Sequence, residues 1–281
     1  MSVLPFELSV KDHIAHLKLN RPDAYNTMNK AFWQTFAESI QQIDIDAEAR
    51  VLVISSTGKH FCAGMDLEIF TQPDPSLFGG EAGRRAEAMR RLVLSLQACF
   101  TVLESVRIPV ITAIQGGCIG GALDLVCAAD MRYCTEDAFF TVKETELGMT
   151  ADLGTLQRLP GLIPSGLARE LAYTGREFSA HEAYQAGLVN QVFSDQTAML
   201  EGVFEIARQI ANRSPLAVTG CKQMINYSRD HSLVDSLNYM ATWQAGMFQP
   251  TDMMQTFKAK MAKVSPEFEP LRTIKQPFSA E

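Results

Sequence analysis

The stretch IPVITAIQGGCIGGALDLVCAADMRYC, residues 108–134, contains the elements that decide the fold. It opens with an apolar run, residues 108–114, which predicts a short buried strand. Four glycines and a short helical segment, residues 121–129, follow before another strand begins at MRYCT. A strand, a helix and a further strand in close succession predict an α/β layer with crossover connections.

The segments on either side continue this alternation. Polar and apolar residues alternate in FELSV and HIAHLKL, which predicts an N-terminal β-hairpin. Apolar residues at helical spacing predict helices over residues 30–43 and 84–105. Two more short strands are expected at VLVISS and AFFTVKE, and a Pro/Gly-rich loop at residues 71–83.

The pattern changes after residue 195, because helical segments then follow one another with no strand between them. Two of these segments have a proline near their start, where proline is tolerated. We therefore predict an α/β core over residues 1–195 and a helical C-terminal region over residues 196–281. The expected helices of that region are residues 195–212, 215–227, 232–247 and 251–262.

Composition narrows the class of partner. The chain has 281 residues, of which 47% are hydrophobic and 20% charged, as is usual for a globular protein. A net charge of −7 without a basic tract argues against nucleic acid, and no apolar run approaches the roughly 20 residues of a membrane span. The polar N-terminal segment and the final Ser-Ala-Glu lead us to expect a cytoplasmic location.

Cysteine and histidine spacing predicts neither disulfides nor a metal site. The six cysteines have no CxxC spacing and lie mostly in apolar surroundings, as expected for free thiols in a reducing compartment. His13 and His16 fall in a strand-like segment, so we expect no metal. The cysteines are Cys62, Cys99, Cys118, Cys127, Cys134 and Cys221.

Two glycine-containing turns suggest a site for a developing negative charge. In the first, the residues after Gly121 are Ala122 and Leu123 rather than the Lys-Ser/Thr of a P-loop, so phosphate binding is not predicted. Either the glycines only form a tight turn, or the Gly121 N–H faces an oxygen that becomes negative. In the second turn, HFCAGMDL, Asp66 is expected to cap a short helix and to leave the Met65 N–H free. Two such N–H groups would make an oxyanion hole.

Three acids near these turns have alternative roles. Asp124 lies in the first turn of the expected helix 121–129, where a carboxylate can pair with the helix dipole. Asp152 precedes LGTLQRL and could cap that helix, or it could act on a ligand. Glu144 is expected to end the strand AFFTVKE, on the face that carries Phe140 and Val142, and so either meets a partner or lines a pocket. Glu146 is expected to be exposed or structural.

Four motifs together resemble the crotonase (enoyl-CoA hydratase/isomerase) superfamily over residues 14–262. They are HFCAGMDL, the stretch 108–134, TVKETELGMTADLGTLQRLPGLI and FSAHEAYQAGLVNQVF. The resemblance implies a β-β-α superhelix whose helical C-terminal region builds homotrimers or homohexamers. It also implies an acyl-CoA thioester substrate with no separate cofactor, and an oxyanion hole made by Met65 and Gly121. The substrate-binding residues implied are Ala63, Gly64, Asp66, Leu67, Gly117 and Gly120.

The acids resemble one subgroup in particular. Hydratases of the superfamily carry glutamates at the places of Asp124 and Glu144 and a glycine at the place of Asp152. Isomerases that convert 3,5-dienoyl-CoA to 2,4-dienoyl-CoA in fatty-acid β-oxidation carry Asp, Glu and Asp. By this resemblance Asp152 is the base at carbon 2, Glu144 delivers a proton to carbon 6, and Asp124 supports the pair.

The alternatives are an enoyl-CoA hydratase, another acyl-CoA enzyme of the superfamily, or an RNA-binding or inert scaffold. For the CoA nucleotide the sequence offers lysines on the last helix, which could equally be a solvated helix face. They are Lys258, Lys260 and Lys263.

Overall fold

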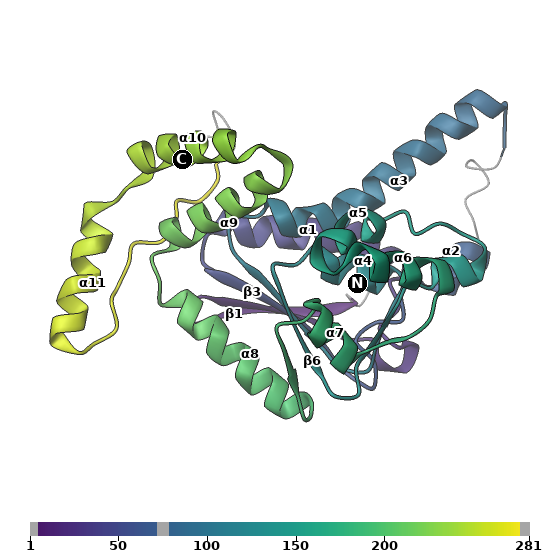
Figure 1. Ribbon diagram of the computed structural model, residues 1–281, viewed down its shortest axis with the longest axis horizontal. Coiled ribbons are helices and arrows are strands. Elements are labelled where there is room, and N and C mark those ends of the chain that lie inside the picture. The colour runs from purple at the N-terminus through teal and green to yellow at the C-terminus, as the bar shows by residue number, and fades with distance from the viewer. Residues whose placement is uncertain (1–4, 72–78, 276–281) are drawn as a thin grey trace.

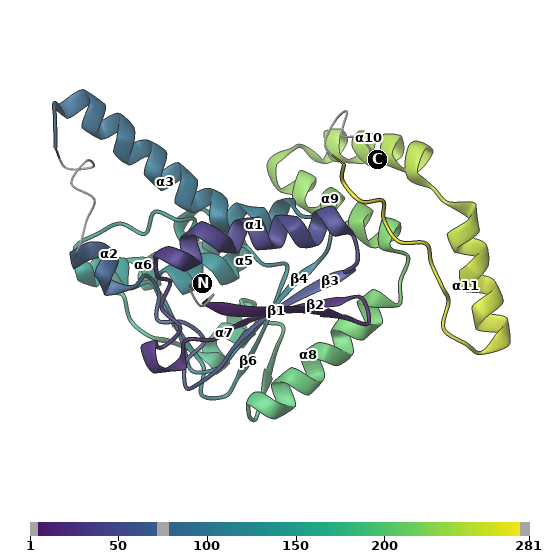
Figure 2. The ribbon, with the colours of Figure 1, turned by 180° about the vertical axis from the view of Figure 1, so that it is seen from behind.

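The computed structural model describes residues 5–71 and 79–275, and most of the predicted loop at 71–83 therefore lies outside the described residues. The body is built on a six-stranded sheet in the order β1-β2-β3-β4-β6-β9, with helices on both faces (Figures 1 and 2). Only β1 runs antiparallel to its neighbour; the other pairs are parallel. These strands are β1 (Phe6–Lys11), β2 (Ile14–Leu19), β3 (Val51–Ser56), β4 (Val110–Ile114), β6 (Met131–Thr135) and β9 (Gln191–Phe193).

A second sheet of three short strands lies at the end of the first. Its order is β5-β7-β8, with β5 parallel to β7 and β7 antiparallel to β8. Strands β4 and β6 of the first sheet are followed directly by β5 and β7 of the second, so the chain passes from one sheet to the other at these two places. The strands are β5 (Gly117–Ile119), β7 (Phe139–Thr141) and β8 (Phe178–Ser179).

Strand β3 has apolar side chains on both of its faces, because helices cover both faces of the sheet. Leu52 and Ile54 pack into the cluster that holds the buried faces of α1 and α3, while Val51 and Val53 pack under α8. A strand covered on both faces needs a continuous apolar run rather than alternation. The helices of the body are α1 (Lys30–Asp46), α2 (Leu67–Thr71), α3 (Ala82–Ser105), α4 (Gly121–Cys127), α5 (Thr155–Leu162), α6 (Ser165–Thr174), α7 (Ala180–Ala186) and α8 (Gln196–Ala211).

The C-terminal region is helical, as predicted, and its last three helices extend away from the sheet (Figure 1). The segment after the last helix returns to the body, where the Ile274 N–H donates to the Ile45 carbonyl. The division at residue 195 stays a prediction, and α8 just after it covers one face of the sheet. The last helices are α9 (Pro215–Asp230), α10 (Leu233–Met247) and α11 (Pro250–Ala262).

The predicted α/β class, the hairpin and the long helices are confirmed, but the strand AFFTVKE is shorter than predicted. Strand β7 ends at Thr141, and Glu144 begins the 3-10 helix Glu144–Leu147. The reason is the loss of a pairing partner: β5 ends opposite Thr141, where its chain turns into α4. Residues 145–150, which follow the end of this strand, are exposed.

All six cysteines are free thiols, as predicted, and Cys221 is the exposed one. Within residues 5–71 and 79–275, no helix has the length and apolar character needed to cross a membrane.

Candidate active site

The glycine-containing turns predicted from the sequence meet in space. Cys62 and Cys118 form a parallel bridge that ties the turn after β3 to β5. At Gly64, where φ is +85°, a Cβ would lie 2.7 Å from the Ile119 carbonyl oxygen, so only glycine allows this approach. A Cβ on Gly121 would lie 3.9 Å from the Met65 backbone nitrogen. The two N–H groups predicted to form a pair therefore lie side by side.

Neither of these N–H groups donates a hydrogen bond to another described residue. Gly121 is the first residue of α4, so no helical carbonyl precedes it as an acceptor. Met65 is bracketed by two bonds to Met28: the Met28 N–H donates to Gly64, and the Asp66 N–H donates to Met28. The chain is thus held on both sides of Met65 while its own donor stays open.

The Asp66 carboxylate stabilises the turn that contains Met65 through hydrogen bonds. One carboxylate oxygen accepts the Glu68 N–H at 3.2 Å, which confirms the predicted cap of α2. The other oxygen accepts bonds from the Thr27 hydroxyl at 2.9 Å and from Arg21 at 3.1 Å. Burial alone would raise the pKa of Asp66, but these three donors together lower it. Sequence reasoning missed Arg21 and Thr27, although the turn-rich NRPDAYNT was visible.

Asp124 is 1% exposed and caps the neighbouring helix rather than its own. Its Oδ1 accepts the Thr155 N–H, the first of α5, at 2.5 Å. The cap residue of α5 is Gly154, which has no side chain to offer, so the alternative in which Asp152 caps this helix is wrong. Burial raises the pKa of Asp124 to about 6; the bond from Thr155 opposes this rise, and the charge of Asp152 adds to it.

Glu144 lies against the turn that carries the Gly121 N–H. A Cβ on Gly120 would lie 3.0 Å from the Glu144 Oε1 atom, and φ at Gly120 is +54°. Burial, together with the charges of Asp124 and Asp152, raises the pKa of the Glu144 carboxyl to about 7. Both carboxyls therefore titrate closer to neutral pH than they would in water.

Asp152 is the most exposed of the three acids. Its pKa is raised by partial burial, and its carbonyl accepts a hydrogen bond from the Gln97 side chain at 2.6 Å. Because its charge acts on both Asp124 and Glu144, the three predicted acids converge on one region. Glu146 is exposed and pairs with Lys143, so its predicted surface role is confirmed.

The remaining predicted residues lie at three separate places. Ala63 and Leu67 flank the Met65 turn, and Leu67 is 70% exposed. Gly117 is packed inside β5, and its N–H donates to His60 at 2.9 Å, so it offers no free backbone donor. The lysines considered for the CoA nucleotide are exposed on or just after α11, on the opposite side of the molecule from α2 (Figure 1). They are Lys258, Lys260 and Lys263.

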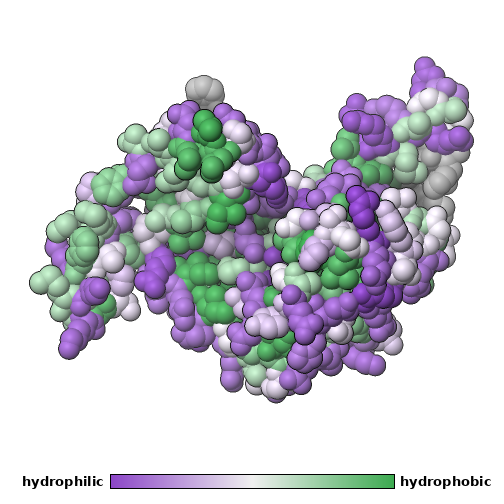
Figure 3. All heavy atoms as spheres, in the orientation of Figure 1, coloured by the Kyte–Doolittle hydropathy of each residue, from purple (hydrophilic) through white to green (hydrophobic). Residues whose placement is uncertain are grey.

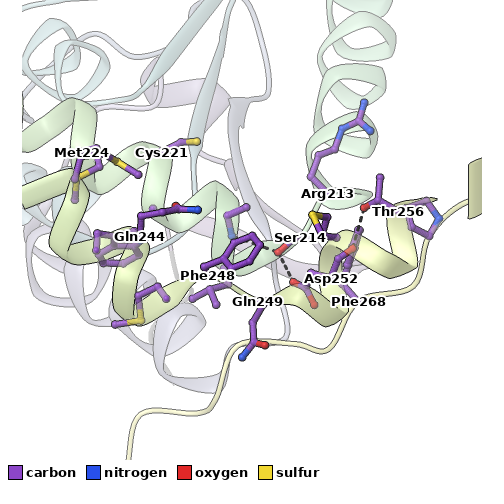
Figure 4. Close-up of a pocket in the computed structure, with 18 of the residues that line it drawn as sticks. Arg213, Ser214, Cys221, Met224, Gln244, Phe248, Gln249, Asp252, Thr256 and Phe268 are labelled. Atoms are coloured by element: carbon purple, nitrogen blue, oxygen red, sulfur yellow. Dashed lines mark hydrogen bonds between the residues drawn. The ribbon is translucent and has the colours of Figure 1, made fainter. Parts of the chain in front are cut away.

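A cavity of about 680 Å³ lies among α9, α10 and α11 and does not include the acids (Figure 4). Its walls are mostly apolar, and at one side the Ser214 hydroxyl donates to Asp252 at 2.5 Å. Among residues 5–71 and 79–275, no group of three or more His, Cys, Asp or Glu could hold a metal ion.

Comparisons with known proteins agree with this geometry. The model of the enoyl-CoA hydratase/isomerase family matches residues 9–270. The chain is 46% identical, over 91% of its length and 78% of the relative's, to the mitochondrial Delta(3,5)-Delta(2,4)-dienoyl-CoA isomerase of Mus musculus. It is 43% identical to the peroxisomal protein of that name in Arabidopsis thaliana, over 91% of this chain and 92% of the other. The crystal structure of an enoyl-CoA hydratase from Bacillus anthracis superposes with a TM-score of 0.83, at 30% identity, over 94% of this chain and 98% of the other.

Proposed function

The chain belongs to the enoyl-CoA hydratase/isomerase family, and from this premise we propose that it shifts the double bonds of 3,5-dienoyl-CoA thioesters to the 2,4 positions. This is the activity named for relatives that share 43–46% of its sequence over most of its length. It places the protein in the β-oxidation of unsaturated fatty acids.

The observation that carries the proposal is the convergence of Asp124, Glu144 and Asp152 beside two free backbone N–H groups. The isomerisation must remove a proton at carbon 2 and add one at carbon 6. These carbons are several ångströms apart, so two separate carboxyls suit the reaction better than one. Buried carboxyls with raised pKa values can exchange protons near neutral pH.

In the proposed mechanism the Asp152 carboxylate takes the proton from carbon 2. The electron pair of that C–H bond forms a double bond between carbons 1 and 2, and the carbonyl pair moves onto the thioester oxygen. When this pair returns, the 2,3 double bond forms, the 3,4 pair moves to the 4,5 position, and the 5,6 pair takes a proton from Glu144 at carbon 6. Asp152 then carries a proton that Glu144 has lost, and this proton must return before the next turnover. Asp124 would support this return through its charge, which acts on the Glu144 carboxyl and is itself affected by Asp152.

The Met65 and Gly121 N–H groups would hold the thioester oxygen during this transfer. Removal of the carbon-2 proton places negative charge on that oxygen, and preorganised donors stabilise it most when they have no other acceptor. Asp66 contributes by fixing the turn that aims Met65. The CoA moiety is part of the substrate, so no separate cofactor is proposed. Ala63, Gly64, Leu67 and Gly120 would border the bound thioester.

We propose that the protein works as a trimer or a pair of trimers. Apolar side chains gather over the α10 and α11 side of the molecule (Figure 3), where Val234 is 76% and Met261 86% exposed. A single chain in water would not leave such a surface uncovered. In such an assembly the lysines on and just after α11 would bind the CoA nucleotide held by a neighbouring chain.

The cytoplasmic location expected from the sequence stays a prediction. The printed names of relatives place the mouse protein in mitochondria and the Arabidopsis protein in peroxisomes. Fractionation of the source cells with an antibody against this chain would decide among the three compartments.

The decisive experiment offers the purified protein 3,5-octadienoyl-CoA and, separately, crotonyl-CoA. The proposal expects a rise in the absorbance of the conjugated 2,4-dienoyl thioester with the first substrate and little hydration of the second. Efficient hydration of crotonyl-CoA without isomerisation would identify a hydratase instead. RNA binding that persists at physiological salt, without turnover of either thioester, would favour the scaffold alternative.

A further inference from the structure

Arg158 occupies an unusual place above the loop that carries Asp152. A Cβ built on Gly154 would lie only 1.8 Å from the Arg158 Nη1 atom, so the guanidinium covers the backbone of that glycine directly. The glycine has φ of +130°, a conformation that side-chain-bearing residues rarely adopt. The loop therefore has its particular bend at the point where the arginine rests.

The guanidinium is anchored on the opposite side by α3. Its Nη2 atom donates to Glu104 at 2.7 Å and to the Thr101 hydroxyl at 3.1 Å. The side chains of Arg158 and Glu104 are each 15% exposed. Glu104 also accepts a bond from Arg229 of α9 at 2.5 Å. Burial tends to raise the pKa of Glu104, but the two arginines lower it, so the anchor stays charged.

The same helix holds the loop at a second point. Gln97, two turns before Glu104 on α3, donates its side-chain N–H to the carbonyl of Asp152 at 2.6 Å. The loop is thus contacted at two points, by Gln97 at Asp152 and by Arg158 at Gly154. A buried ion pair of this kind adds little net stability, because the desolvation of both charges offsets their attraction. Its position at the acid-bearing loop suggests a different use.

We propose that Arg158 is a positioning residue of the isomerase: held by Glu104, it fixes the loop 152–154 so that Asp152 and Asp124 face the same substrate. This inference rests on the proposed function for its kinetic consequences. Its consequence for the free protein, the titration of Asp124, does not require the reaction.

The charge of Arg158 also acts on the carboxyl of Asp124, which other polar groups contact as well. The Thr155 N–H and Asp152 act on it from the α5 side, and it acts in turn on the Glu144 carboxyl. Arg158 opposes the rise in the pKa of Asp124 caused by burial. Replacing the guanidinium with a neutral side chain should therefore make the carboxyl harder to ionise. A role limited to packing would leave this titration unchanged.

The test compares Arg158→Met with Arg158→Lys, which keeps a charge but not the forked geometry. With aspartate labelled by ¹³C at the carboxyl, and the Asp124 signal assigned from Asp124→Asn, Arg158→Met should raise the pH at which this signal titrates. Arg158→Lys should shift it less. In turnover of 3,5-octadienoyl-CoA, Arg158→Met should lower kcat by about 10- to 100-fold with KM changed less than about twofold, since a misplaced base slows proton transfer more than binding.

Glu104→Gln is the second variant, because it loosens the anchor without touching the loop; it should reproduce a smaller part of the kcat loss. Arg208→Met is the matched control, since Arg208 pairs with Glu205 on the exposed face of α8, and it should behave as the wild type. A folded Arg158→Met protein with unchanged Asp124 titration and unchanged kcat would overturn the inference. If the wild type does not turn over the dienoyl thioester, the proposed function fails, while the titration still decides the role of Arg158.

Discussion

Two regions of the molecule depart in opposite ways from the rule that apolar groups are buried and charged groups exposed. At the acid junction, where Asp124 and Glu144 lie, carboxyl groups are removed from water, and on the helices α10 and α11 apolar groups are exposed. At the acid junction, loss of contact with water raises the pKa of the buried Asp124 to about 6 and that of the partly buried Glu144 to about 7. On α10 and α11, apolar side chains such as Val234 and Met261 are exposed. Both arrangements cost free energy in an isolated chain. In the proposed function, the first serves proton transfer and the second serves association.

The strongest way to break this comparison is to neutralise the proposed base. Asp152→Asn should lower turnover of 3,5-octadienoyl-CoA by about 10²- to 10⁴-fold, the range that a positioned general base contributes. It should also abolish exchange of the carbon-2 proton in deuterated water, which mass spectrometry of the recovered thioester measures. Asp23→Asn, in the surface 3-10 helix Pro22–Ala24, is the control and should exchange normally. Normal exchange in Asp152→Asn would remove Asp152 from the role of base.

The position of Asp152 also shows what sequence reasoning could and could not reach. The buried strands and amphipathic helices were predictable because each follows from a local period of apolar residues. The glycine-containing turns pointed to the two N–H groups and to the three acids near them, and the resemblance to a known family supplied the role of each acid. The actual cap of α5 was not predictable: Asp124 lies 31 residues before Thr155, and nothing local shows that a side chain from α4 replaces the expected cap.

The interactions that hold the site were missed for the same reason. Arg158 meets Glu104 across 54 residues, and Arg21 meets Asp66 across 45, so neither pair has a sequence period. The end of β7 was mispredicted because strand length depends on a partner: Val142 alternates correctly with Phe140, but β5 has already turned into α4. Local pattern gives the face of a residue, and tertiary pairing decides whether its strand continues.

The second prediction concerns the backbone donors rather than the acids. In Gly64→Ala the new Cβ would lie 2.7 Å from the Ile119 carbonyl oxygen, so the turn must shift and take the Met65 N–H with it. Loss of one oxyanion-hole donor typically costs about 10²- to 10³-fold in kcat. Stopped-flow or steady-state absorbance with the dienoyl thioester measures this. Gly166→Ala, where a Cβ would meet nothing within 4 Å, is the matched control. Equal kcat in both variants would show that the Met65 N–H does not hold the thioester oxygen.

The third prediction tests the opposite member of the comparison. Val234→Asp combined with Met261→Asp places charge on the exposed apolar surface of α10 and α11. We expect the molar mass measured by light scattering to fall from that of a trimer or hexamer to that of one chain, because a buried unpaired carboxylate opposes association. Thr197→Asp adds one carboxylate to the exposed start of α8, away from that surface, and should leave the mass unchanged. A wild type that is already monomeric would show that these apolar residues serve another purpose.

The smallest expected effect sharpens the comparison at the junction, because it measures the cost of burying an acid. Burial raises the pKa of Glu144 from 4.5 to about 7, so between these values the folded chain binds a proton that the unfolded chain has released. Stability contributed by this site is therefore present below pH 4.5 and is lost as the pH rises to about 7. Glu144→Gln removes the titration, and at pH 8 it should raise the free energy of unfolding by about 1–3 kcal/mol, since each pKa unit corresponds to about 1.4 kcal/mol. Urea unfolding followed at pH 5 and pH 8 measures the difference; Glu146→Gln, two residues away and exposed, should keep the slope of the wild type. If Glu144→Gln also kept that slope, the carboxyl would be solvated in the free protein, and its burial would have to come from the substrate.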